Sequence, residues 1–266
     1  MEVTKSSAFI GLFYLCLVVW WVTIFLSGAK DDPTNKAFAF AYGLLPLLGG
    51  AVGFLNSKKW GLFKSAMGKA LFFLSLGLIT WGFGEMIWSY YNFVLRIEVP
   101  YPSWADASFI VSWPLWSIGV VFLSLATGAR FGLKTMNGRL QLIVIPIIAL
   151  AASYYLLVVV ARGNSFEISG GPLKIFFDLA YPIWDVVILT LALLVYGLSF
   201  KYLGGVFQWP VVILLLGFVI NYFADFGFSY TTTVNTFYNG SWVDLLFASA
   251  MFLLSFGVAG FDVQEG

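Results

Sequence analysis

Residues 81–119 read WGFGEMIWSYYNFVLRIEVPYPSWADASFIVSWPLWSIG. An aromatic and otherwise uncharged run carries Glu85, a polar loop ends at Ser103-Trp104-Ala105-Asp106, and a second apolar run follows. A charged group inside a membrane helix is costly and marks a candidate functional site. The stretch therefore predicts two membrane helices joined by a loop, with acidic side chains close to that loop.

The same landmarks return in the second half of the chain at offsets of 138 to 140 residues. They are Glu85 with Asp225, Ser89-Tyr90 with Ser229-Tyr230, Ser103-Trp104-x-Asp106 with Ser241-Trp242-x-Asp244, Gly119 with Gly257, and Ala41-Tyr42 with Ala180-Tyr181. We therefore expect two four-helix units, residues 1–130 and 131–266, within one integral membrane domain. Because four spans is an even number, the two units run parallel, and their symmetry axis lies along the membrane normal. The repeat is degenerate, since Asp185 has no acidic counterpart in the first unit.

The composition assigns the chain to the all-α polytopic membrane proteins. Its 266 residues are 61% hydrophobic, 20% aromatic and only 10% charged. Eight apolar runs reach the ~20 residues that a membrane helix needs. They lie near residues 8–27, 37–55, 67–95, 104–127, 140–161, 173–200, 206–229 and 242–261. We expect a multi-pass protein of the cell membrane, surrounded by the lipid bilayer.

The distribution of Lys and Arg predicts the orientation. One side of the predicted bundle carries nine of these residues and the other side carries five. The excess favours both termini in the cytoplasm. Asn239-Gly240-Ser241 would then lie outside, where it forms a glycosylation sequon.

Several classes of function are excluded. The chain has no His and a single Cys, so Cys/His zinc sites, His-ligated haem and Ser-His-Asp catalysis are ruled out. It has no phosphate-binding loop and no nucleophile elbow, and we expect neither an enzyme nor a metal site. The net charge of +1, without a basic cluster, gives no indication of a nucleic-acid partner. The sequence identifies no cofactor, and Cys16 is expected to pack in the core.

Six acids are expected in the outer half of the bilayer, where Lys174 is the one base at a similar depth. Four lie within predicted helices and two in first helical turns; they are Glu85, Asp178, Asp185, Asp225, Asp106 and Asp244. Burial disfavours the charged form of a carboxyl group. We therefore expect shared protons, a bound cation or a cationic ligand.

Five of the six acids also have a structural interpretation. Asp106 and Asp244 follow Ser-Trp at helix starts, where they would cap the helix and complement its dipole. Glu85 and Asp225 would instead hydrogen-bond to neighbouring Ser, Tyr or Trp groups. Asp185 would satisfy backbone N–H groups freed in a helix that Pro182 is expected to break.

Aromatic residues accompany these acids. Trp88, Tyr181 and Trp184 are expected beside them, in a cavity that would suit a cation or an amphipathic ring. Trp104 and Trp242 precede Asp106 and Asp244 near helix ends, where interfacial belts also place Trp. We include all five aromatic residues in the candidate ligand-binding set, with core packing as the alternative.

Four motifs in a fixed order carry a resemblance to a known family. They are Gly84-Glu85, Tyr101-Pro102-Ser103-Trp104-Ala105-Asp106, Tyr181-Pro182-x-x-Asp185 and Ser241-x-x-Asp244. Over residues 70–260 the chain resembles the eight-helix input domains of bacterial and archaeal sensors, which precede diguanylate cyclase (GGDEF), phosphodiesterase (EAL) or histidine-kinase modules. The resemblance implies a sensory role and marks Glu85, Asp106, Asp185 and Asp244 as family-pattern acids, without assigning their chemistry. Only five residues follow Phe261, so we expect the signal to pass to a partner chain.

Three functions are compatible with these patterns. The first is a membrane-embedded sensory or ligand-binding module that acts through partner proteins. The second is a structural accessory subunit of a larger membrane complex, in contact with other membrane chains. The third is a small cation or proton transporter, which the intramembrane acids and the duplication suggest.

Overall fold

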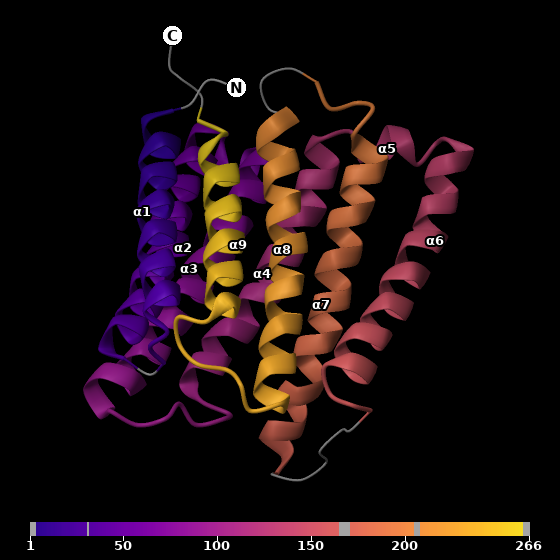
Figure 1. Cartoon of the computed structure of the whole chain (residues 1–266). Coiled ribbons are helices and arrows are strands. Elements are labelled where there is room, and N and C mark those ends of the chain that lie inside the picture. Colours follow the sequence, from indigo (N-terminus) through magenta and orange to yellow (C-terminus); the bar gives the residue numbers. More distant parts are fainter. Residues whose placement is uncertain (1–3, 31, 165–170, 205–207, 263–266) are drawn as a thin grey trace.

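Eight long helices run side by side, and each is long and apolar enough to cross a membrane (Figure 1). The computed structural model describes residues 4–30, 32–164, 171–204 and 208–262, which contain helices and no strand. The prediction of eight apolar spans is confirmed, and the chain fits a multi-pass membrane protein. The expected connections through residues 165–170 and 205–207, and the chain after Asp262, lie outside the described residues.

The spanning helices are α1 (Lys5–Ser27), α2 (Pro33–Lys59), α3 (Ala66–Tyr90), α4 (Trp104–Ala126), α6 (Met136–Ser153), α7 (Pro172–Ser199), α8 (Gln208–Thr233) and α9 (Trp242–Ala259). The π-helical turns η2 (Tyr91–Leu95) and η3 (Tyr154–Val160) extend α3 and α6, and the short elements η1 (Leu62–Lys64) and α5 (Ala129–Gly132) lie in connections. The start of α1 and the end of α9 lie at the same end of the bundle (Figure 1). We call the opposite end, where α3 is followed by α4 and α8 by α9, the far end.

Local sequence signals fix the helix starts at the far end. Asp32 caps α2, because its carboxylate accepts hydrogen bonds from the N–H and hydroxyl of Thr34. Ser103 and Asp106 form a capping box at the start of α4. In contrast, α7 starts at Pro172 without a side-chain cap, because Gly171 at its N-cap position has no side chain.

The core lies between α2, α3, α4, α8 and α9, while α1 and α6 lie at the two edges of the bundle (Figure 1). Trp113, Trp116 and Phe218 are among its largest fully buried side chains. Trp116 meets Trp113 and Phe218 edge to face, with ring centroids 5.8 and 5.6 Å apart. These tryptophans therefore pack in the core.

Several interhelical contacts join the halves of the chain, and two of them involve helices that carry candidate acids on one side and candidate tyrosines on the other. Helix α2 packs against α9, and α4 packs against α7. Each contact pairs a helix that carries a tyrosine, the buried Tyr42 or the half-buried Tyr181, with a helix that begins with an acidic first turn. These two contacts position the candidate site.

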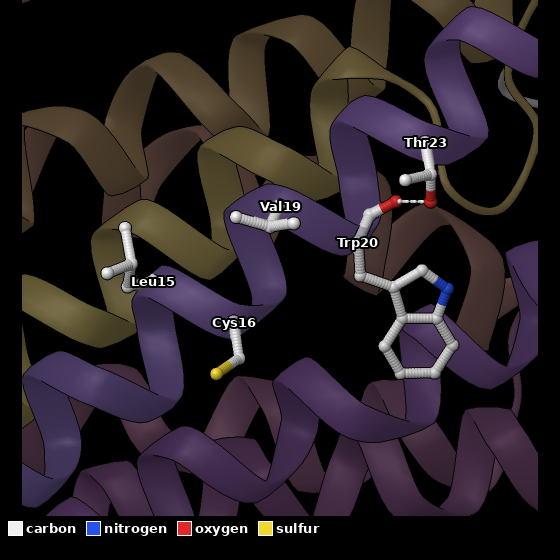
Figure 2. A pocket seen from close by; sticks show the side chains of 5 residues that line it. All are labelled: Leu15, Cys16, Val19, Trp20 and Thr23. Carbon is white, nitrogen blue, oxygen red and sulfur yellow. Dashed lines mark hydrogen bonds between the residues drawn. The ribbon is translucent and has the colours of Figure 1, made fainter.

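Cys16 corrects a prediction, because it is exposed and does not pack in the core. It lies in an open depression of about 460 Å³ whose lining residues, Leu15, Cys16, Val19, Trp20 and Thr23, all come from α1 (Figure 2). Helix α1 buries little of its surface against its neighbours, so this face is the one that lipid would cover. The depression contains none of the candidate site residues.

Candidate functional site

A pair of acids forms the centre of the first polar group, which we call the α7–α8 cluster: Asp185, Asp225, Asn221, Tyr181 and Asp106. Asp185 is only 2% exposed, and its carboxyl group interacts directly with that of Asp225 on the neighbouring helix. Asn221, one helical turn before Asp225, donates from Nδ2 to Asp225 Oδ2 at 2.7 Å. Asp185 Oδ1 is buried and has no hydrogen-bond partner within the described residues. The pair thus contains an acceptor that the described protein leaves unused.

Asp106 has two roles at once. Its Oδ2 accepts hydrogen bonds from the N–H and the hydroxyl of Ser103, at 2.7 and 2.8 Å, which confirms the predicted capping. Its Oδ1 accepts from the Tyr181 hydroxyl of α7 at 3.0 Å. Tyr181 also lies within electrostatic range of Asp225. The capping acid of α4 is therefore connected through Tyr181 to the acids of α7 and α8.

Helix α7 continues through Pro182, which we had expected to break it, and Arg162 binds the carbonyl group that this proline leaves free. Proline lacks an N–H, so it leaves the carbonyl of the residue four positions earlier, Asp178, without its helical partner. Arg162 Nη1 donates to this carbonyl oxygen at 2.9 Å. The backbone group that lacks its helical partner is therefore a carbonyl, and a side chain from outside the helix binds it. We had predicted that Asp185 would bind freed N–H groups, and this prediction is wrong.

The same guanidinium lies close to the acids. Arg162 Nε is 3.4 Å from Ser229 Oγ on α8, and its charge acts on Asp185. We had expected only Lys174 among the bases at this depth, and Arg162 corrects that expectation. The α7–α8 cluster therefore includes a positive charge.

Polar groups continue from this cluster to the rim of the far end. The Tyr101 hydroxyl donates to Asp178 Oδ1 at 2.8 Å, and Lys174 Nζ lies 3.4 Å from Asp178 Oδ2. Burial of its hydroxyl end, together with this bond to Asp178, raises the pKa of Tyr101, although the whole residue is 45% exposed. Tyr101 therefore remains a hydrogen-bond donor across the physiological range.

A second group, which we call the α2–α3 cluster, consists of Tyr42, Glu85 and Asp244. Glu85 is 4% exposed, and the groups that act on it are Asp244 of α9 and the Tyr42 hydroxyl of α2. Glu85 Oε1 is buried without a hydrogen-bond partner within the described residues. Asp244 accepts from the N–H of Gly240, just before α9.

The α8–α9 connection lies over the ends of α2 and α3 beside this cluster. Asn35 Nδ2 donates to the Asn239 carbonyl oxygen at 2.9 Å, and Trp88 Nε1 donates to Asn239 Oδ1 at 3.0 Å. Asn239, the acceptor position of the predicted sequon, thus has its side chain held against Trp88. Trp21 of α1 binds the next part of the connection through the Ser241 carbonyl oxygen, at 3.0 Å.

The predicted aromatic residues occupy different environments. The Trp88 ring meets Phe228 and Phe237 edge to face, near the α2–α3 cluster. Trp184, which precedes Asp185 in the chain, packs against the core. Trp104 is 77% exposed at the start of α4, and the Trp242 ring packs on Gly227 of α8.

The structure divides the six predicted acids between two groups. Four of them, Asp106, Asp178, Asp185 and Asp225, lie along α4, α7 and α8, and the remaining two, Glu85 and Asp244, lie in the α2–α3 cluster. Three participants were not predicted as site residues: Tyr42, Asn221 and Arg162. The match of Tyr42 with Tyr181, and the spacing of Asn221 one turn before Asp225, were signals available in the sequence. The carbonyl freed by Pro182 was the signal for a donor such as Arg162.

The chemistry of these groups suits protons and small cations. Within the described parts of the chain, no group of three or more His, Cys, Asp or Glu side chains is arranged to hold a metal ion. Comparison of the chain with protein-family models, curated proteins and solved structures gives no match. The argument for function therefore depends on the two clusters.

Proposed function

We propose that the chain is a membrane-embedded sensory module that binds a proton or another small cation at the α7–α8 cluster and acts through partner proteins. The observation that carries this proposal is the unpartnered, buried Oδ1 of Asp185 beside the carboxyl group of Asp225. Two adjacent carboxylates do not both remain charged in an apolar bundle without a cation between or beside them. Arg162 offsets one negative charge, and a bound proton or cation would offset the other.

The arrangement of polar groups favours a sensor over a transporter. The rim residues Lys174, Asp178 and Tyr101 connect the far end with the acidic pair. Toward the other end, α7 buries the apolar residues Ile188, Leu189, Ala192 and Val195. A ligand that enters from the far end would therefore reach the pair and then meet this apolar face of α7.

We infer the orientation and the duplication from the sequence. The excess of Lys and Arg at the end with the termini would place the far end outside a cell membrane. The matching contacts of α2 with α9 and of α4 with α7 support two parallel four-helix units, residues 1–130 and 131–266. We propose that the signal passes to another membrane chain by direct contact.

A fluorescence titration tests the binding site. We expect the tryptophan fluorescence of the purified protein in lipid nanodiscs to change with pH, or with Na⁺ at constant pH. The change should disappear in Asp185→Asn and remain in Glu98→Gln, which removes an exposed acid from the α3–α4 connection. An unchanged response in Asp185→Asn would contradict the proposal.

The partner proteins need a separate experiment. Mild-detergent purification from the native membrane, followed by mass spectrometry, should recover a signalling protein that elutes with the chain. A fixed stoichiometric set of structural membrane chains, combined with no ligand response, would instead support the accessory-subunit alternative.

A further inference from the structure

The α2–α3 cluster has the same chemical composition as part of the α7–α8 cluster. Each contains a tyrosine, an acid within a helix and an acid from the first turn of another helix; they are Tyr42, Glu85 and Asp244, and Tyr181, Asp225 and Asp106. In each set the first-turn acid comes from the half of the chain that does not contain the other two. Asp244 of α9 reaches the first half, and Asp106 of α4 reaches the second half.

Glu85 supplies an independent indication of a ligand. Its Oε1 is buried and unpartnered, and the groups acting on the side chain are an acid and a phenol. A buried carboxylate without a counter-charge is strongly disfavoured. Asp244 is better placed than Glu85 to carry the negative charge, because it accepts a hydrogen bond from the Gly240 N–H and lies in the first turn of α9.

The stem of Glu85 packs closely against α2. A Cβ atom built on Gly43 would lie 2.6 Å from Glu85 Cγ and 2.7 Å from the Met86 methyl carbon. On the other side, Phe109 of α4 lies against Gly84. Within the described residues, no group of three or more His, Cys, Asp or Glu side chains is arranged here to hold a metal ion.

We propose that the α2–α3 cluster is a second proton-binding site, in which Glu85 holds a proton beside the Asp244 carboxylate and the Tyr42 hydroxyl. A role of this site in sensing rests on the proposed function, whereas the bound proton can be detected whether or not the chain is a sensor. The groups around the site are Tyr42 from α2, Asp244 from α9, Phe109 from α4, and Asn239 with its partner Trp88. No charged group other than Asp244 is among those acting on Glu85 in the described structure.

Infrared spectroscopy of the full chain in lipid nanodiscs tests this site. A protonated carboxyl group has a carbonyl stretch that a carboxylate lacks, and we expect this band in the wild type at neutral pH. Glu85→Gln should lose part of the band, whereas Asp185→Asn should retain the part that belongs to Glu85. Tyr42→Phe keeps the carboxyl group and should shift the band, because the phenol no longer donates to it.

Two results would overturn the proposal. The first is a spectrum of Glu85→Gln that superimposes on that of the wild type at every pH. The second is a change of the band in Asp185→Asn when Na⁺ replaces N-methylglucamine at constant pH, if this change is absent from the double variant Asp185→Asn/Glu85→Gln, because it would indicate an alkali-metal site at Glu85. Either result leaves the α7–α8 cluster untouched, since that site is tested by the fluorescence response of Asp185→Asn.

Discussion

The two acidic clusters share a tyrosine and two acids, yet they differ in charge balance. In the α7–α8 cluster a third acid, Asp185, is accompanied by Arg162, and Lys174 lies at the rim. In the α2–α3 cluster the groups that act on Glu85 are Asp244 and Tyr42. The α7–α8 cluster thus has one more buried acid, Asp185, together with a base, Arg162. The α2–α3 cluster has neither, and its charge must be balanced in another way.

The proline of α7 provides the position for that base. The Asp178 carbonyl, freed by Pro182, binds Arg162, and this contact places the guanidinium near Asp185. In α2, Gly43 occupies the place of Pro182 after the shared tyrosine, and it allows Glu85 to approach closely. One residue after the tyrosine thus distinguishes a cluster with a base from a cluster of close-packed acids.

The largest expected effect concerns Arg162. We predict that Arg162→Leu lowers the free energy of unfolding by about 2 kcal/mol, because the Asp178 carbonyl loses its partner. In a Pro182→Ala background the new N–H can bind that carbonyl, so the loss should be smaller. Unfolding in detergent of the two single variants and the double variant measures this coupling.

Arg96→Leu is the matched control, since Arg96 is exposed in the connection after η2. It should leave stability nearly unchanged. If Arg162→Leu lowered the free energy of unfolding equally with and without Pro182, the two residues would act independently. Pro182 would then not explain the position of Arg162.

The next effect concerns the close contact of α2 and α3. We predict that Gly43→Ala destabilises the bundle by about 2 kcal/mol, because the added methyl group overlaps Glu85 and Met86. Gly11→Ala is the control, as its Cβ would meet only Phe256, at 3.9 Å. Gly11→Ala should be neutral or stabilise by about 0.5 kcal/mol. Thermal unfolding of both variants decides, and an equally stable Gly43→Ala would refute the close packing.

A smaller effect tests whether the two tyrosines are equivalent. Tyr181→Phe removes the donor to Asp106 Oδ1 and should cost about 1 kcal/mol. We expect Tyr42→Phe to cost a similar amount, and Tyr90→Phe, at an exposed position, to cost almost nothing. A large loss at one tyrosine and none at the other in chemical denaturation would break the correspondence between the clusters.

The smallest effect concerns the helices that carry the two tyrosines. The Thr34 hydroxyl and N–H lower the pKa of Asp32, whereas α7 has no side-chain cap. A lowered pKa contributes stability at neutral pH that is lost as the pH falls below about 4. Asp32→Ala should therefore lower the melting temperature slightly at pH 7 and hardly at all at acidic pH, while Asp32→Asn keeps most of the cap. A difference that persists unchanged in acid would exclude the carboxylate as its source.

The sequence predicted the eight spans because their apolar runs are long and uninterrupted, and it predicted the capping by Asp106 from its position after Ser103. It did not predict the division of the acids, because this depends on which helices pack across the halves. The exposed side of α1, with Cys16, was also missed, since α1 is apolar on all sides and its pattern does not distinguish core from lipid. Arg162 was missed because its role follows from a missing N–H in another helix.

Proton flux across sealed liposomes tests the central claim most directly, since a sensory site open at one end binds a cation without passing it on. Liposomes with the wild-type protein and an internal pH dye should show no proton flux above that of protein-free liposomes, while external pH still changes the tryptophan fluorescence. A flux that the wild type supports and Asp185→Asn abolishes would contradict the account and identify a transporter.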